Sequence, residues 1–323
     1  MNQARITAIG MAVPNKAIPN SFYETIVDTT DEWIVSRTGV QMRYHASSDE
    51  FTSDLCVEAV ENMLSRFDVN LRDVDLVLAA TTSPDQPMPG VACRLQFRLG
   101  LDKAGAFDLY AACAGFAYGI IVAKGLIAAG SHRKVLVVAG ETLSKITDFT
   151  DRTSCVLFGD GAGAVLVEAA DVGNIGQGIT GAYGAGGPDL YISGFADTID
   201  GQAVVHNRKI MQNGRKVFKW AVQTMSENYQ KLLALNNMKA DELNWFIPHS
   251  ANLRILEAIS QETGYPMDHI LQSVVNYGNT SSASIPIAFC KALDEGRIQA
   301  GDNIMMLGFG GGLTYAGIVI RWM

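Results

Sequence analysis

Sequence features that mark metal sites and disulfide scaffolds are missing from this chain of 323 residues. No CxxC pair occurs, and the odd number of cysteines, at positions 56, 93, 113, 155 and 290, indicates reduced thiols rather than a disulfide framework. The five histidines are scattered without metal-ligand spacing. We therefore expect neither a structural disulfide nor a bound metal.

Signals for export, membrane insertion and nucleic-acid binding are also scarce. The first ten residues lack the apolar run and cleavage site of a signal peptide, which together with the reduced cysteines favours a cytoplasmic protein. The longest mostly apolar stretch, 106–130, is interrupted by Asp108, Lys124 and several glycines, so it does not predict a membrane span. A net charge of −8 argues against general nucleic-acid binding.

Apolar residues are abundant, at 48% of the chain, and they occur in short runs that alternate with helical patterns. This alternation predicts α/β architecture, and the length allows two halves. Three segments recur at one constant offset (241 − 73 = 168). The matched pairs are 73–81 with 241–249, 134–140 with 302–308, and Cys113 with position 281. The repeat predicts two copies of one fold, over residues 1–172 and 173–323, with functional loops at the strand ends.

Cys113 is the most informative single residue. It precedes a run of small and apolar residues, 114–129, which predicts a buried helix closed by Gly130. At a helix N-terminus the unpaired N–H groups and the helix dipole favour an anion, so we expect a lowered pKa for this thiol. The alternative is a buried structural cysteine, but the small neighbours leave room for a substrate to reach the sulfur.

The second copy contributes three further candidate functional features, each at the end of a predicted strand or in a predicted loop. His249 stands in Pro-His-Ser-Ala-Asn, and Asn279 lies in the loop equivalent to that of Cys113. The three glycines at 310–312 allow a backbone N–H to approach an oxyanion. A satisfied structural histidine, a turn asparagine and a tight glycine turn are the alternatives.

Taken together, these motifs resemble the β-ketoacyl-acyl carrier protein synthase III enzymes of the thiolase-like superfamily, nearly end to end. The resemblance is carried by residues 28–34, 37–39, 111–116, 150–152, 158–163, 248–254, 277–281 and 308–312. It implies a thiolase-like duplicated α-β-α-β-α layered fold and an acyltransferase that initiates fatty acid biosynthesis. The pattern looks like the Gram-positive members, which tend to take branched-chain primers.

The resemblance implies a catalytic triad of Cys113, His249 and Asn279. Cys113 would attack an acyl-CoA thioester and hold the acyl group, while the N–H groups of Cys113 and Gly311 stabilise the oxyanion. His249 and Asn279 would then donate hydrogen bonds to the thioester carbonyl of malonyl-acyl carrier protein as CO₂ leaves. Acyl-CoA is a substrate here, and neither a metal nor a redox cofactor is implied.

Binding positions are implied by the same resemblance. The CoA-binding positions are Thr29, Trp33, Arg37, Arg152, Gly214, Phe218 and Asn252. Trp33 and Arg152 would sandwich the adenine, although a core position is the alternative for Trp33. Phe158 and Ile210 match the acyl pocket. Met88 matches a pocket residue that family members insert from the other subunit, which implies a homodimer.

The sequence departs from the family pattern at three places. Ser250 stands where many members have Gln, and Tyr183 replaces a commonly acidic residue. Gln261-Glu262 occupies a position where some members carry two lysines used for carrier-protein docking. Segment 207–220 has five positive residues and no acidic one, so it is a candidate replacement surface for an acidic carrier protein, unless it is only a solvated face. The candidate docking residues are Arg215, Lys216, Lys219 and Arg254.

Three other functions remain open. A related enzyme that loads or condenses acyl groups in specialised metabolism would share the triad. A cysteine protease has Cys, His and Asn in the same order, but the small-residue cysteine loop and the duplication argue against it. A non-catalytic scaffold or carrier-binding protein would not need an intact triad.

Overall fold

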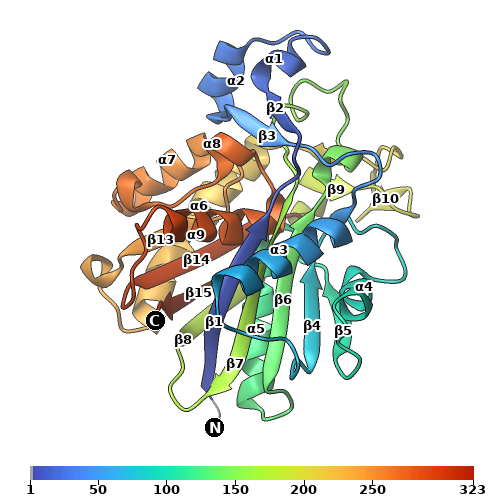
Figure 1. The fold of residues 1–323 in the computed structure, drawn as a ribbon. Helices are drawn as coiled ribbons and strands as arrows, with labels where there is room; N and C mark the ends of the chain where they lie inside the picture. Colours follow the sequence, from blue (N-terminus) through green and yellow to red (C-terminus); the bar gives the residue numbers. More distant parts are fainter. Residues whose placement is uncertain (1–2) are drawn as a thin grey trace.

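Two β-sheets organise the chain in the computed structural model, which describes residues 3–323 (Figure 1). The first sheet has the order β1 (Gln3–Ala12), β7 (Gly161–Ala170), β6 (Lys134–Glu141), β4 (Leu76–Ala80), β5 (Gly105–Leu109). The second has the order β13 (Trp245–Pro248), β14 (Asn303–Gly310), β15 (Thr314–Arg321), β8 (Ile175–Ala182). Each sheet combines parallel pairs, β4 with β6 and β13 with β14, with antiparallel neighbours.

Shorter strands pair outside these sheets. The pairs are β2 (Ala17–Pro19) with β3 (Met42–Tyr44), β9 (Leu190–Ile192) with β12 (Ile210–Gln212), and β10 (Thr198–Ile199) with β11 (Gln202–Ala203). The helices are α1 (Asn20–Tyr23), α2 (Asp31–Thr38), α3 (Thr52–Arg66), α4 (Val91–Arg98), α5 (Gly115–Ala128), α6 (Gly214–Leu235), α7 (Leu253–Thr263), α8 (Val274–Tyr277) and α9 (Ser284–Asp294). None of the helices between residues 3 and 323 is both long and apolar enough to cross a bilayer.

Helices and sheets alternate in five layers. Buried side chains of α3 and α4 pack on one face of the first sheet, and those of α6 and α7 pack on the far face of the second. Between the sheets lie α5 and α9, whose apolar side chains contact both. This arrangement confirms the predicted duplicated α-β-α-β-α layering.

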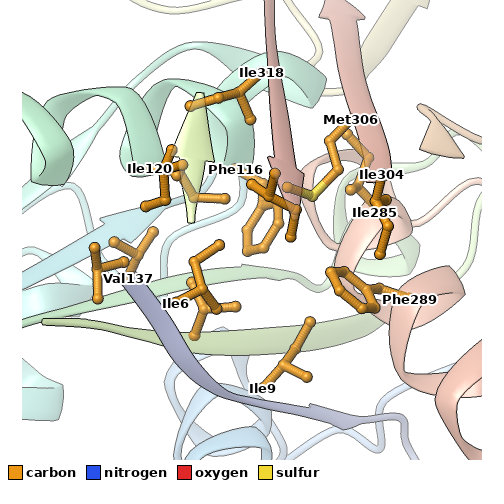
Figure 2. Close-up of a cluster of buried hydrophobic side chains, with 14 of the residues drawn as sticks. Ile6, Ile9, Phe116, Ile120, Val137, Ile285, Phe289, Ile304, Met306 and Ile318 are labelled. Carbon is orange, nitrogen blue, oxygen red and sulfur yellow. The ribbon is translucent and has the colours of Figure 1, made fainter. Parts of the chain in front are cut away.

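The central layer is the largest apolar cluster of the molecule. Figure 2 shows Phe116 of α5 and Phe289 of α9 among side chains from both sheets, such as Val137 and Met306. Side chains alternate along each strand, so on β6 Val137 faces this cluster and Val138 faces α3. Burying each large apolar side chain contributes about 1.5–3 kcal/mol, so the two halves are held together by one shared core.

The internal repeat is present, but its offset is one larger than predicted. The starts of β6 and β14 give 303 − 134 = 169, and the starts of α5 and α9 give 284 − 115 = 169. Strand pairing agrees, because Leu76 lies beside Val135 and Trp245 beside Ile304. Strands buried on both faces lack the polar alternation that would have fixed their register from sequence. The predicted boundary at residues 172 and 173 falls between β7 and β8.

Candidate active site

Cys113 lies in a short turn between the first sheet and the central layer. The turn, η1 (Ala112–Ala114), opens with Ala112 at a φ of 44° and continues directly into α5. The sulfur therefore lies at the N-terminal end of a buried helix, as the sequence predicted. The residue borders a cavity of about 380 Å³.

The other predicted catalytic residues come from the second half and border the same cavity. His249 directly follows β13, Asn279 precedes the turn η6 (Ser281–Ala283), and Gly311 directly follows β14. The structure thus brings together residues that lie up to 198 positions apart in the chain (311 − 113 = 198).

Close packing at Gly310 places the Cys113 turn against β14. A Cβ atom on Gly310 would lie 2.6 Å from the backbone nitrogen of Cys113 and 3.0 Å from its Cβ. Only glycine permits this approach. The N–H of the next residue, Gly311, makes no hydrogen bond to any backbone acceptor within residues 3–323, so it is free to act as a donor into the cavity.

The imidazole of His249 is held in place on several sides. Its Nδ1 lies 2.7 Å from the Ser284 hydroxyl, and its ring makes an edge contact with Phe309 at 5.0 Å. Burial lowers the pKa of His249 to about 3, partly opposed by the Ser281 carbonyl. The ring is therefore neutral at physiological pH.

Asn279 is fixed by its backbone and by one side-chain oxygen. Its N–H donates to the Leu157 carbonyl at 2.8 Å, and its own carbonyl accepts from Gly159 N–H at 3.0 Å. The Oδ1 atom accepts from the Ser281 N–H at 2.9 Å. The side-chain amide nitrogen is left as a donor for a ligand.

The predicted fall in the pKa of Cys113 is wrong. Burial raises the pKa of the thiol to about 12, the Ser281 side chain opposes this by hydrogen bonding, and the Glu141 carboxyl adds to the rise. Desolvation of the sulfur is the largest cause of this rise, although the residue is partly exposed where it borders the cavity.

The predicted CoA positions divide into two groups. Gly214, Phe218 and Asn252 border the cavity, whereas Thr29, Trp33, Arg37 and Arg152 lie outside its lining. The Arg152 guanidinium stacks directly on the Trp33 ring, 4.9 Å from its centroid, and donates to the Asp28 carbonyl at 2.7 Å. An adenine ring needs about 3.5 Å on each face, so it could enter only after Arg152 moves away. Among residues 3–323, no cluster of three or more His, Cys, Asp or Glu side chains is placed to hold a metal ion.

The predicted acyl-pocket residues also differ in position. Phe158 and Ile210 border the cavity and pack together with Leu143. Met88 is 85% exposed and does not border it. The resemblance implied that Met88 enters the pocket of the other subunit, so its absence from this cavity does not contradict that expectation.

The candidate docking residues are only partly free to attract an acidic partner. Lys216 forms an ion pair with Asp189 at 2.9 Å, and Arg254 forms one with Glu257 at 2.7 Å. Arg215 and Lys219 are exposed on α6 and have no ion-pair partner in the described part of the chain. Of the four candidates, Arg215 and Lys219 therefore keep an unpaired positive charge.

Sequence reasoning missed the buried carboxyl of Glu141 and the hydroxyls around it. Glu141 ends β6, next to the end of β4, and accepts hydrogen bonds from Thr82, Ser83 and Ser282. A signal was available, because Glu141 follows the apolar run 135–140 and a Thr-Thr-Ser sequence follows the neighbouring strand. Carboxyl ends of adjacent parallel strands share one edge of a sheet.

Comparison with known proteins gives one consistent picture. A family model described as 3-oxoacyl-[acyl-carrier-protein (ACP)] synthase III matches residues 107–184, and a model for the C-terminal part of that enzyme matches residues 233–322. The chain is 48% identical over 323 residues to β-ketoacyl-[acyl-carrier-protein] synthase III 2 of Bacillus subtilis (strain 168), covering 100% of this chain and 99% of the relative. This similarity bears out the predicted resemblance to the Gram-positive members.

Solved structures of similar enzymes have the same fold as this chain. The β-ketoacyl-[acyl carrier protein] synthase III of Thermus thermophilus superposes with a TM-score of 0.95 at 42% identity, covering 99% of both chains. The priming β-ketosynthase from the R1128 polyketide biosynthetic pathway superposes with a TM-score of 0.92 at 34% identity, covering 99% of this chain and 96% of that chain. These similarities confirm the predicted thiolase-like fold.

Proposed function

The chain belongs to the 3-oxoacyl-[acyl-carrier-protein] synthase III family, and we propose that Cys113, His249 and Asn279 carry out its reaction. Members of this family, also named β-ketoacyl-acyl carrier protein synthase III, are acyltransferases of fatty acid synthesis. The chain accordingly condenses an acyl-CoA with malonyl-acyl carrier protein. The observation that supports the residue roles is the shared cavity, where the sulfur at a helix N-terminus meets His249, Asn279 and Gly311.

In the first half-reaction Cys113 attacks the acyl-CoA thioester. The tetrahedral oxyanion accepts hydrogen bonds from the N–H groups of Cys113 and Gly311, and collapse expels CoA to leave an acyl-cysteine. The test is to mix the protein with acyl-CoA alone and to look for the acyl adduct on Cys113 by mass spectrometry. An unmodified Cys113 would contradict this assignment.

In the second half-reaction malonyl-acyl carrier protein occupies the vacated site. His249 and Asn279 donate hydrogen bonds to its thioester carbonyl as CO₂ leaves, and the enolate attacks the acyl-cysteine. This role requires the His249 proton on Nε2, with Nδ1 accepting from Ser284. The Ser284 oxygen accepts the Ser250 N–H at 3.2 Å, and its hydroxyl proton remains available to donate to Nδ1 of His249 at 2.7 Å. Decarboxylation generates the carbanion, so the proposed reaction uses neither a metal nor a redox cofactor.

We also propose that the preferred primer is a short branched acyl-CoA, as in the Gram-positive members. Phe158 and Ile210 supply an apolar wall for it. A kcat/KM series over acetyl-, isobutyryl-, isovaleryl- and 2-methylbutyryl-CoA tests this. A clear preference for acetyl-CoA would contradict it.

A homodimer would complete the pocket. β5 is an edge strand, and near it Met88, Phe97 and Tyr110 are exposed, so this side offers an apolar surface for a second copy. A hollow bordered by Tyr110, Ala112 and Gly311 leads from this edge toward the Cys113 turn. We propose that the partner subunit's Met88 enters there. Sedimentation of the native protein as a monomer would contradict it, and Met88→Phe should shift selectivity toward acetyl-CoA.

Carrier-protein docking is proposed on α6, where Arg215 and Lys219 are unpaired. Arg215→Glu combined with Lys219→Glu should raise KM for malonyl-acyl carrier protein several-fold, more at low salt, while acylation by free acyl-CoA changes little. Equal loss in both half-reactions would contradict the docking role. We place the activity in the cytoplasm, where a nucleophilic thiol stays reduced.

A role in specialised metabolism is a second candidate. It is favoured by the similarity to the R1128 priming β-ketosynthase. Comparing malonyl groups carried by a fatty acid carrier protein and by a polyketide carrier protein distinguishes the two, because the proposed primary role predicts a higher kcat/KM with the former.

A further inference from the structure

Asp160 is a buried carboxyl that lies between the acyl pocket and the start of β7. It follows Phe158 by two residues, and it takes part in none of the ion pairs within residues 3–323. Three donors from two other segments satisfy it instead. The Ser144 N–H donates to Oδ1 at 2.8 Å, the Ala46 N–H donates to Oδ2 at 2.8 Å, and the Ser144 hydroxyl also donates to Oδ2. A buried charge without a cation depends on such hydrogen bonds, so the carboxyl and its donors hold one another in place.

Ser144 belongs to the short turn η2 (Leu143–Ile146), which also supplies a wall of the cavity. Leu143 is buried, borders the cavity and packs with Phe158 and Ile210. One planar peptide bond joins Leu143 to Ser144, so a shift of the Ser144 backbone moves Leu143 as well. Asp160 thus connects the two sides of the apolar wall, because it is linked to Phe158 through the chain and to Leu143 through Ser144.

Leu143 lies between two anchored neighbours. Before it, the Thr142 N–H donates to the Ser83 hydroxyl at 2.8 Å, which ties the turn to the edge of the first sheet. After it, Ser144 is tied to the buried Asp160 carboxyl. The ammonium group of Lys209 also donates to a carbonyl of η2 at 3.0 Å, but it stands on a long, flexible side chain that can follow a displaced turn. Without the carboxyl, Leu143 would stay anchored on the sheet side alone.

We propose that the contact between Asp160 and Ser144 sets the length of acyl chain that the pocket accepts, because it holds Leu143 against the primer. The proposal rests on the acyl pocket of the proposed function. Asp160 is not among the described residues that border the cavity, so it is a positioning residue that acts through Leu143. Room for one methylene group changes selectivity by about 10–200-fold, so a small displacement of this wall is measurable.

The experiment measures kcat/KM for hexanoyl-CoA and for isobutyryl-CoA, with malonyl-acyl carrier protein as second substrate, at about pH 8. Burial raises the pKa of Asp160 to about 6, so the carboxyl is ionised under these conditions. The ratio of the two kcat/KM values is taken within one preparation. It does not depend on the fraction of folded enzyme, so a loss of stability alone leaves it unchanged.

Asp160→Asn keeps one acceptor oxygen and replaces the other with an NH₂ group. The amide keeps most of its partners when the oxygen faces Ala46 N–H and the Ser144 hydroxyl, which turns the NH₂ group toward the Ser144 N–H. Two donors then oppose each other, and η2 loses its anchor beside Leu143. The ratio of hexanoyl-CoA to isobutyryl-CoA should rise about tenfold or more.

Variants of Ser144 keep the test valid if Asp160→Asn does not fold. Ser144→Ala removes the hydroxyl contact but keeps the N–H contact, so the ratio should rise by a smaller factor, about threefold. Ser144→Thr restores a hydroxyl and should leave the ratio as in the unmodified protein. Asp302→Asn is the matched control, because Asp302 Oδ2 accepts the Trp245 indole N–H and the Gln299 N–H, each at 2.9 Å. It lies at the start of β14, whereas Gly311 and the cavity are at the other end of that strand, so the ratio should not change.

Two results would overturn the proposal. One is a ratio that stays the same or falls in both Asp160→Asn and Ser144→Ala, and the other is a rise in Asp302→Asn equal to that in Asp160→Asn. Failure of the proposed function is seen separately, because the unmodified protein would then form no acyl adduct from any acyl-CoA.

Discussion

The two halves of the chain have the same kind of short turn, η1 and η6, at equivalent positions, but the side chains on the two turns differ. η1 and η6 each contain or open with a residue at positive φ, 44° at Ala112 and 49° at Ser281. Each turn leads into a central helix, and each packs against a middle strand of the other half, η1 on β14 and η6 on β6. At the observed offset the counterpart of Cys113 is Ser282 (113 + 169 = 282).

The residues at the ends of the middle strands show the difference. β14 ends in Gly310, which lets the Cys113 turn approach, whereas β6 ends in Glu141, which holds Ser282 by a hydrogen bond. One half thus presents a cysteine thiol to a cavity, and the other buries a hydroxyl against a carboxyl. The duplication fixes where the loops meet, and the residue at each position decides which loop is reactive.

The largest effect is expected at the two equivalent turn positions. Cys113→Ala removes the nucleophile and should lower condensation by at least about 10³-fold and abolish the acyl adduct. Ser282→Ala removes one hydrogen bond to Glu141 and should cost less than about tenfold. Adduct formation and condensation are measured on both variants. Similar losses would mean that the two turns are not functionally distinct.

A second contrast is at the ends of β4 and β13, where His249 is the counterpart of Ala80 (249 − 80 = 169). His249→Ala gives the second half the residue of the first. We expect acylation to continue and condensation to fall about 10²–10³-fold, because the lost hydrogen bond acts on the malonyl carbonyl. Mass spectrometry of the adduct and a condensation assay separate the two steps. A block of acylation as complete as that of Cys113→Ala would show that His249 also serves the first step.

A third test removes the asymmetry in backbone packing. Gly310→Ala places a methyl group against Cys113 and should lower acylation by about 10–10²-fold, with a loss of about 1–3 kcal/mol in the free energy of unfolding. Gly125→Ala on α5 is the control, since a Cβ there meets nothing within 4 Å and alanine favours helix by about 1 kcal/mol. Urea unfolding and adduct formation are measured on each. An unchanged acylation rate in Gly310→Ala would mean that the close approach is not needed.

Sequence patterns predicted the layers and the meeting of the catalytic loops for a clear physical reason. Strands end in loops at one edge of a sheet, so residues just after apolar runs, such as His249 and Gly311, had to converge once the repeat was seen. The offset was missed by one because fully buried strands carry no alternation. The pKa of Cys113 was predicted in the wrong direction, because burial and the charge of Glu141 depend on side chains that are distant in sequence.

Two binding features depended on geometry that sequence does not contain. Trp33 and Arg152 were expected to hold an adenine between them, and in this structure they stack directly on each other. Met88 was expected to enter the pocket of the other subunit, and in the single chain it is exposed. Whether a partner covers it is a property of the assembly and not of local sequence.

The smallest expected effect concerns the pH dependence of stability, where the contributions of His249 and Asp160 should differ in sign. His249 has a pKa of about 3 when folded and 6.5 when exposed, so between these values only the unfolded chain binds the proton. Its contribution to stability is present above pH 6.5 and is lost as pH falls. Asp160 in the first half has a pKa raised by burial from 3.8 to about 6, so the folded chain holds the proton in that window. Its contribution is lost as pH rises.

Urea unfolding of two variants at pH 5 and pH 7 separates these contributions. The stability deficit of His249→Ala relative to the unmodified protein should shrink by about 2 kcal/mol between pH 7 and pH 5, because the unmodified protein alone loses the histidine contribution. Asp160→Asn should instead gain about 1 kcal/mol relative to the unmodified protein between pH 5 and pH 7. Shifts of the same sign in both variants would mean that His249 or Asp160 does not have the pKa that its environment indicates.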